Sequence, residues 1–248
     1  MATVTSPISL IFDEAGLVVV DKPSGLPVVP GGGAQPGDCV RALLERQLGA
    51  EVWVVHRLDR ETSGVLLFAR TPELHRELCL AFEQRRVRKT YIAFTLGTPV
   101  PREGRIETPL HPARRGKVRP ALPGEDGAWD AATRYIVRKH WERDGAAVAM
   151  VETHPETGRH HQIRAHLRSI GTPILFDRVY GPAAGAAQVA GSPAVRLALH
   201  ASMLAVPGAE AEGRLHTFEA PLPADLTALL HWLDAEWTVV AGPTSSPG

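Results

Sequence analysis

Short apolar runs separated by turn residues constrain the fold of this chain more than any other feature. The runs at residues 8–12 and 17–21 flank an Asp-Glu-Ala-Gly turn, which is typical of two short strands. Similar runs recur at residues 52–55, 65–68, 89–96, 146–153 and 197–206. Because strands and helices mix without strict βαβ alternation, the sequence predicts an α+β fold with a mixed, largely antiparallel central sheet flanked by helices and loops.

Four stretches have the apolar spacing of amphipathic helices. Leu74, Leu78 and Phe82 recur every fourth residue and predict a helix over residues 72–86. The other three predicted helices are one capped by Asp38 and ended by Gly49, one over 159–170 with Gly171 behind it, and one around 226–233.

Composition excludes several classes of protein. The chain has 248 residues, of which 44% are hydrophobic and 22% charged, so low-complexity and fibrous classes are excluded. Two cysteines, Cys39 and Cys79, cannot build a disulfide framework or a cysteine zinc site. No run approaches the roughly 18 apolar residues of a membrane helix, and the N-terminus lacks a basic signal-peptide region. We therefore expect a cytoplasmic protein without membrane association.

Common motifs for phosphate, metal and serine chemistry are absent. The Gly31–Gly33 run lacks the Lys-Ser/Thr of a phosphate loop. Histidines cluster near residue 160, but His160 and His161 are adjacent and face different sides of the predicted helix, and no HExxH is present. Ser24 and Ser63 are each followed by glycine in a turn context. We expect no metal site and no cofactor.

Charge is distributed unevenly along a chain of zero formal net charge. Residues 84–119 hold ten Lys and Arg against Glu103 and Glu107, a balance of +8, whereas residues 205–248 hold six acids and one base, a balance of −5. Such polarity can present a basic face to a polyanion. Residues 98–130 are rich in Pro, Gly and Arg, and we expect a basic, flexible connection there.

Two segments combine charged residues in ways that suit a functional site. HRLDRETSG, residues 56–64, places Asp59 in a connection between two predicted strands, where rigid scaffolds carry catalytic groups. In TGRHHQIRAHL, residues 157–167, Arg164 shares a helix face with Arg168, opposite the stripe of Ile163 and Leu167. Read without further context, the first segment also suits a surface salt-bridge loop and the second a solvated helix face.

The two segments resemble motifs of the RluA-type pseudouridine synthases, which isomerise uridine in structured RNA. LVVVDKPSGLPVVP at 17–30 resembles that family's first motif, and KTYIAF at 89–94 its Lys-x-Tyr motif. ILFDRVYG at 174–181 and LALHA at 197–201 resemble later motifs. The matches are ordered and span residues 10–206. The resemblance implies the pseudouridine synthase catalytic fold in a single domain over residues 1–248.

The resemblance also implies roles for individual residues. Asp59 corresponds to the family's essential carboxylate, Tyr91 to the tyrosine that stacks on the target base, and Arg164 to the arginine that pairs with the aspartate. Arg57 is a candidate to fill the space left by a flipped nucleotide, and Ile163 to pack beside the base. Two motif positions depart from the family: Phe176 replaces the usual glycine and His160 the common threonine.

The remaining predicted contacts with substrate are basic or polar. His56 is expected to hold the loop rather than to transfer protons, and the planar fork of Arg159 suits a phosphate. The first motif begins within twenty residues of the N-terminus, so the catalytic domain is expected to bind RNA without a preceding RNA-binding domain. We expect the basic connection to contact RNA phosphates and to order on binding, through Arg114, Arg115 and Lys117.

The sequence therefore predicts an enzyme that converts uridine to pseudouridine in ribosomal or transfer RNA, as a monomer. A second hypothesis is a non-catalytic RNA-binding protein on the same fold. A third is a hydrolase of nucleosides or glycosides, which generally uses two carboxylates about 5 to 10 Å apart. Glu61 and Glu152 are the candidates for a second carboxylate beside Asp59, and neither lies in a supporting motif.

Overall fold

A computed structural model describes residues 7–31, 37–182, 189–208 and 215–240 and divides the chain into two compact units. Unit 1 comprises Met1–Tyr91 and Leu199–Leu222, and unit 2 comprises Ile92–Ala198 and Pro223–Gly248. Unit 1 is therefore discontinuous in sequence, because unit 2 is inserted between its two pieces. The single catalytic domain expected from the sequence stays a prediction.

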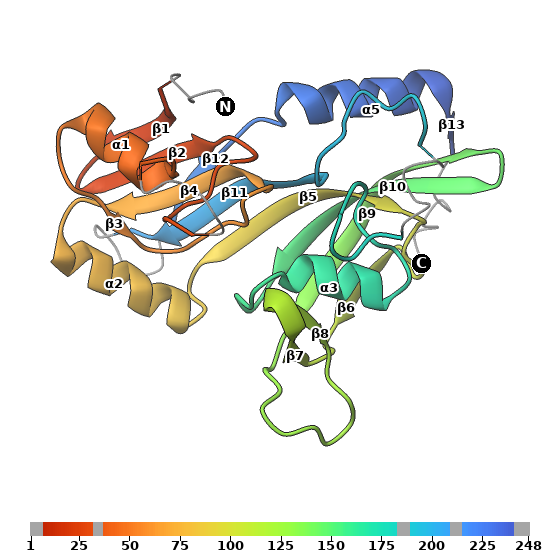
Figure 1. Cartoon of the computed structure of the whole chain (residues 1–248), viewed down its shortest axis with the longest axis horizontal. Helices are drawn as coiled ribbons and strands as arrows, with labels where there is room; N and C mark the ends of the chain where they lie inside the picture. The colour runs from red at the N-terminus through yellow and green to blue at the C-terminus, as the bar shows by residue number, and fades with distance from the viewer. Residues whose placement is uncertain (1–6, 32–36, 183–188, 209–214, 241–248) are drawn as a thin grey trace, which may run out of the picture. The chain divides into compact units, whose positions relative to one another are not determined.

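Unit 1 is built on a sheet in which four strands have the order β1-β2-β4-β11 (Figure 1). The strands are β1 (Ser9–Glu14), β2 (Leu17–Lys22), β4 (Ser63–Ala69) and β11 (Leu199–Pro207), with β3 (Trp53–Val54) beside β4 and β12 (Leu215–Glu219) beside β11. These pairs are antiparallel except for β4 and β11, which run parallel. The mixed, mostly antiparallel sheet confirms the predicted fold class.

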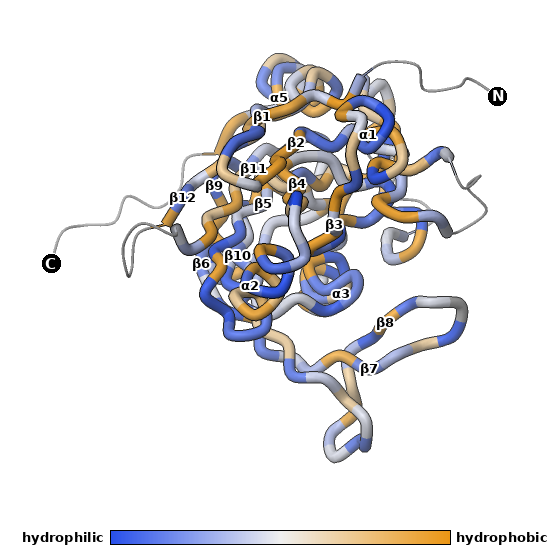
Figure 2. Tube along the Cα trace, turned by 90° about the vertical axis from the view of Figure 1, so that its left-hand side faces the viewer, coloured by the Kyte–Doolittle hydropathy of each residue, from blue (hydrophilic) through white to orange (hydrophobic). Residues whose placement is uncertain are grey.

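Alternate residues of β2 and β4 face opposite sides of this sheet, and a helix covers each side. Val18 and Phe68 belong to the core that includes Val40 and Leu44 of α1 (Val40–Leu48). Their neighbours Val19, Val65 and Leu67 pack instead with Leu78 of α2 (Pro72–Glu83). Strands buried on both faces read as continuous apolar runs, which is why these strands stand out in the sequence (Figure 2).

The ends of these helices follow local sequence rules with one exception. The Thr71 side chain accepts a hydrogen bond from the Leu74 N–H and caps α2, whose first residue is a proline. Gly49 ends α1 in the left-handed conformation, as predicted. The predicted cap at Asp38 is wrong: Cys39 occupies the N-cap position of α1 and makes no side-chain capping bond.

Unit 2 contains a second group of strands in the order β5-β10-β9-β13, with β6 beside β9 (Figure 1). β5 (Arg88–Leu96) begins in unit 1 and belongs to unit 2 from Ile92 onwards. The others are β6 (Glu103–Ile106), β9 (Thr133–Arg143), β10 (Ala146–Pro155) and β13 (Thr238–Val239). The helices are α3 (Gln162–Ser169) and α5 (Ala224–Glu236). α3 is shorter than predicted, because His161 before it adopts a left-handed backbone with φ of 52°.

The segment 98–130, predicted to be a basic and flexible connection, contains regular structure. It contains β6, a hairpin of β7 (Leu110–Ala113) and β8 (Lys117–Pro120), and a 3-10 turn, η1 (Arg114–Gly116), at the hairpin tip. Figure 2 shows this hairpin beside α3, which β8 contacts. Prolines at 109, 112 and 120 obscure the short strands in the sequence.

No helix in the described part of the chain has the length and apolar character needed to cross a membrane.

Candidate active site

Asp59 lies in a tight turn that connects β3 to β4 in unit 1. The Thr62 N–H donates to the Asp59 carbonyl oxygen at 3.1 Å, which closes the turn. Asp59 is half-buried and Arg57 is exposed. The turn leads directly into β4, in which every residue is buried.

A second loop, which follows β2, holds the Asp59 turn through main-chain atoms. Lys22 is completely buried, and its Nζ donates to the Arg60 carbonyl oxygen at 3.0 Å. The Gly25 N–H donates to the same oxygen at 2.8 Å, and the Ser24 hydroxyl donates to the Glu61 carbonyl oxygen at 2.6 Å. These bonds fix the backbone of Arg60 and Glu61, the two central residues of the turn.

The exit of the turn is fixed by a buried hydrogen-bond chain. His200 Nε2 lies 3.1 Å from the Ala220 carbonyl oxygen, so this nitrogen carries the proton. His200 Nδ1 then accepts from the Ser63 hydroxyl at 3.0 Å. A Cβ on Gly64 would lie 2.1 Å from the Ala201 carbonyl oxygen, so only glycine allows β4 and β11 to approach this closely.

His56 anchors the start of the turn and stays neutral. Burial, together with the nearby positive charge of Lys89, lowers the pKa of His56 to about 3. Its Nε2 accepts the Leu67 N–H at 3.1 Å, and its ring stacks on Phe82 with centroids 4.9 Å apart. A histidine with this pKa does not transfer protons at neutral pH. The role of His56 in holding the loop stays a prediction.

Tyr91 lies on β5 and packs against the core cluster of unit 1 that contains Leu58. Burial and the negative charge of Asp59 raise the pKa of the Tyr91 hydroxyl. The structure thus brings Tyr91 and Asp59 within electrostatic range of each other. A phenol whose pKa is raised stays protonated at neutral pH and remains a hydrogen-bond donor.

Arg164 is buried in unit 2, which excludes the alternative reading of this segment as a solvated helix face. Its side chain is 7% exposed, and its Nε and Nη2 donate to the two carboxylate oxygens of Asp177 at 2.7 and 2.8 Å. Every residue of α3 from Gln162 to Leu167 is buried, so Ile163 shares the buried environment. The two-point ion pair gives the buried guanidinium of Arg164 a charged partner.

Tyr180 joins the start of α3 to the hairpin of β7 and β8. Its hydroxyl accepts the Val118 N–H at 2.9 Å and lies 3.1 Å from His161 Nδ1. Its ring lies beneath the Arg164 guanidinium, 5.1 Å from centroid to Cζ. His160, exposed beside His161, contacts the Gly116 carbonyl oxygen of η1 at 3.0 Å through Nε2. The tip of the hairpin and β8 are therefore tied to the start of the helix that carries Arg164.

The predicted phosphate-binding residues lie at the tip and base of this hairpin. Arg114 and Lys117 are exposed, and no described residue forms an ion pair with either. Arg115 lies between them in η1, but its side chain falls outside the described residues. Arg159 Nε donates to the Asp130 carbonyl oxygen at 3.1 Å, which ties it to the segment after the hairpin.

The predicted site residues thus fall into two groups. Unit 1 holds His56, Arg57, Asp59 and Tyr91, and unit 2 holds the other six. The six are Arg114, Arg115, Lys117, Arg159, Ile163 and Arg164. The pairing of Asp59 with Arg164 stays a prediction.

Sequence reasoning missed Lys22, Asp177 and Tyr180 as contributors to the site. All three lie in segments quoted for their resemblance, yet no periodicity links Asp177 to an arginine 13 residues earlier on a helix. The available signal was chemical: Asp177 is the one acid in the motif ILFDRVYG, and a carboxylate is the partner that a buried arginine requires.

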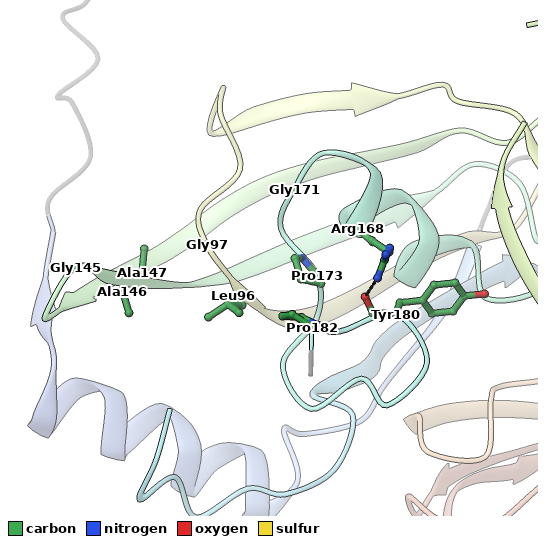
Figure 3. Close-up of a pocket in the computed structure, with 10 residues that line it drawn as sticks. All are labelled: Leu96, Gly97, Gly145, Ala146, Ala147, Arg168, Gly171, Pro173, Tyr180 and Pro182. Atoms are coloured by element: carbon green, nitrogen blue, oxygen red, sulfur yellow. Dashed lines mark hydrogen bonds between the residues drawn. The ribbon is translucent and has the colours of Figure 1, made fainter. Parts of the chain in front are cut away.

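Unit 2 also contains a cavity of about 610 Å³, with Tyr180 in its wall. Figure 3 shows Arg168 and Tyr180 at one side and the glycines Gly97, Gly145 and Gly171 around the rest. Arg168 donates to the Tyr180 carbonyl oxygen, so its charge is already engaged. None of the predicted site residues lines the cavity.

Comparison with known proteins agrees with these motifs. A family model described as RNA pseudouridylate synthase matches residues 16–169, which include Asp59, Tyr91 and Arg164. The chain is 37% identical over 212 residues to the dual-specificity RNA pseudouridine synthase RluA of Escherichia coli K12, covering 86% of this chain and 92% of that protein.

Two further relatives extend the comparison. The ribosomal large subunit pseudouridine synthase D of Nitrosomonas europaea is 36% identical over 233 residues, which cover 90% of this chain but only 64% of that protein's length. The solved structure of human RNA pseudouridylate synthase domain containing 4 superposes with a TM-score of 0.72 at 27% identity, covering 91% of this chain and 93% of that chain.

Proposed function

Because the chain belongs to the RNA pseudouridylate synthase family, we propose that it isomerises uridine to pseudouridine in structured RNA. One observation carries this proposal: the family match contains the Asp59 turn, Tyr91 and Arg164 within a single stretch of the chain. The names of two relatives point to ribosomal RNA and to dual specificity. We therefore propose ribosomal or transfer RNA as the substrate.

The reaction exchanges one bond to the ribose for another. The bond from ribose C1′ to uracil N1 breaks, the uracil turns, and a bond from C1′ to C5 forms. The C5 proton leaves and N1 gains a proton, so the product is an isomer and no oxidant or reductant is consumed. Asp59 is proposed as the essential carboxylate, which attacks the base or the sugar, or removes a sugar proton.

The geometry of unit 1 supports this role for Asp59. Its turn is fixed by Lys22, Ser24 and Gly25 through main-chain carbonyls, and such preorganisation lets a carboxylate meet the substrate without rearrangement. Tyr91, protonated and within electrostatic range of Asp59, suits stacking on the target base. Arg164 is proposed to stabilise the carboxylate charge, and Ile163 to pack beside the base.

Access to the glycosidic bond requires that the uridine leave its stack. Arg57 is exposed beside the turn and is proposed to fill the space that a flipped nucleotide leaves. Arg114, Arg115 and Lys117 at the hairpin of β7 and β8 are proposed to contact phosphates, which position RNA without reading its sequence. A uridine in a loop or bulge is the expected target, because such bases splay out readily.

The test is release of tritium from transfer and ribosomal RNA transcripts labelled at uridine C5. The native chain is compared with Asp59→Asn and with Asp144→Asn, which changes an exposed carboxylate in the β9–β10 turn. Release by the native chain and by the Asp144 variant, but not by the Asp59 variant, supports the isomerase. RNA binding without release from any transcript would favour a non-catalytic RNA-binding protein, and free uracil would favour a hydrolase.

A further inference from the structure

Asp177 uses both carboxylate oxygens to hold other groups of unit 2. Oδ2 accepts from Arg164 Nε at 2.7 Å, and Oδ1 accepts from Arg164 Nη2 at 2.8 Å. Oδ1 also accepts the N–H groups of Val179 at 2.9 Å and Tyr180 at 3.0 Å. The Asp177 side chain is 0% exposed, so substrate does not reach it while these contacts hold.

The two-point contact fixes the plane of the Arg164 guanidinium. A side-on pair through Nε and Nη2 leaves one rotamer for a side chain that otherwise has many, and it turns the opposite edge away from Asp177. The Tyr180 ring limits movement perpendicular to that plane, because it lies 5.1 Å beneath the guanidinium carbon. The guanidinium is thus constrained along one edge and across one face.

The backbone that carries Asp177 is itself fixed and strained. Phe176 adopts φ of 60°, in the left-handed region where a non-glycine residue is disfavoured. The Gly181 N–H donates to the Asp177 carbonyl oxygen at 2.8 Å, and a Cβ on Gly181 would lie 2.5 Å from that oxygen. Strain of this kind persists only where surrounding contacts determine the conformation, and it gathers at functional sites.

Stability alone does not explain a buried pair of this kind. Removing both charges from water is costly, and apolar residues of similar volume often stabilise a core at least as well. Burial acts to raise the pKa of Asp177, but the Arg164 guanidinium and the two backbone N–H donors hold it below the usual value. The Asp177 carboxylate is therefore charged. Its four hydrogen-bond donors, two from Arg164 and two from the backbone, fix its position relative to Arg164.

We propose that Asp177 is a positioning residue for the isomerisation, acting through Arg164. It holds the guanidinium in one orientation, so that the edge opposite to Asp177 is presented ready for the reacting groups. The inference rests on the proposed function, because Arg164 is a catalytic candidate only if the chain is an isomerase. It adds to that function a residue with no contact to substrate.

The test compares Asp177→Asn with a matched control in the same unit. Arg196 and Asp225 form a pair of the same shape, with Nε to Oδ2 at 2.7 Å and Nη2 to Oδ1 at 2.9 Å. Asp225→Asn removes the same charge from the same geometry without touching Arg164. We expect Asp177→Asn to lower kcat about 100-fold, the cost of misplacing a catalytic group by about 1 Å, and to leave KM for RNA unchanged. The control retains the native kcat.

Asp177→Glu keeps the charge and lengthens the side chain, so it serves if the Asn variant does not fold. A native kcat in either folded variant overturns the inference, as does an equal fall in kcat for the Asp225 control or a rise in KM that accounts for the loss. Failure of the proposed function is distinguishable, because the native chain would then release no tritium from any RNA.

Discussion

The Asp59 turn and the Arg164 pair solve the same problem in different ways. In unit 1, Lys22, Ser24 and Gly25 hold the turn by its main-chain carbonyls. In unit 2, Asp177 holds Arg164 by the guanidinium itself. One catalytic candidate is placed through its backbone and the other through its side chain.

Because of this difference, we expect a change at Asp59 to affect activity more than stability, and a change at Arg164 to affect both. A change at Asp59 leaves the contacts that fix its turn intact. A change at Arg164 leaves a charged, buried partner without its counter-ion, which is among the most costly changes a core can undergo. The experiments below are arranged to break or sharpen that contrast.

The largest expected effect is the loss of activity in Asp59→Asn. We expect kcat to fall by at least about 10³-fold, within the range for removing a group that acts directly in the chemistry, with little change in the melting temperature. Tritium release and thermal unfolding on the same sample measure both quantities. If the variant lost its fold together with its activity, the Asp59 side chain would also be needed for stability, and the contrast with Arg164 would be wrong.

Arg164→Met is expected to lower the free energy of unfolding by about 3–5 kcal/mol, because Asp177 stays buried and unpaired. Arg196→Met is the control: Asp225 is 41% exposed, so water solvates it and the loss is below about 1 kcal/mol. Urea unfolding of both variants measures the two losses in the free energy of unfolding. Equal losses in the two variants would show that burial of the pair does not govern its cost.

His56 gives a pH dependence that belongs to unit 1. The folded chain keeps His56 neutral down to about pH 3, whereas the unfolded chain protonates it below about pH 6.5. Protons therefore favour the unfolded state as pH falls through this window. Between pH 6.5 and 4.5, we expect native stability to fall about 1.4 kcal/mol per pH unit more steeply than that of His56→Asn.

Urea unfolding at closely spaced pH values measures the two slopes. His231→Asn, which removes an exposed histidine from α5, controls for loss of a histidine as such. Identical slopes for the native chain and His56→Asn would mean that the ring does not have to be neutral in the folded turn.

The smallest expected effect concerns the hairpin of β7 and β8. Arg114→Ala with Lys117→Ala is expected to reduce the slope of log affinity against log salt by about 1.4–1.8, since each lost phosphate contact contributes about 0.7–0.9. The kcat at saturating RNA should stay native. Arg41→Ala with Arg76→Ala removes the same charge from exposed helix positions of unit 1. An unchanged slope in the hairpin variant removes the proposed phosphate contacts.

Periodicity predicted the elements whose neighbours are close in sequence. The strands β1 and β2, the helix α2 and the ends at Gly49 and Gly171 follow from alternation, apolar spacing and local capping. Local rules suffice there, because each element's partner or terminator lies within a few residues.

Features that depend on partners far away in the sequence were not predicted. The apolar spacing of α3 placed Arg164 on the face opposite Ile163 and Leu167, but it could not show that Asp177, on another segment, pairs with Arg164. The hairpin in 98–130 was missed because its strands contain Pro112, Ala113, Lys117 and Pro120, which are poor strand formers. In both cases a tertiary contact decides the local structure.

The hydrogen bond between Ser63 and His200 joins residues 137 positions apart. A chain emerging from the ribosome makes the Asp59 turn early, but β11 and the imidazole that secures the turn's exit follow only after all of 92–198 has been synthesised. A nascent or truncated chain that stops before Leu199 carries the whole HRLDRETSG motif and lacks the strand beside it. The exit of the Asp59 turn therefore gains these contacts only after residues 92–198 have been synthesised.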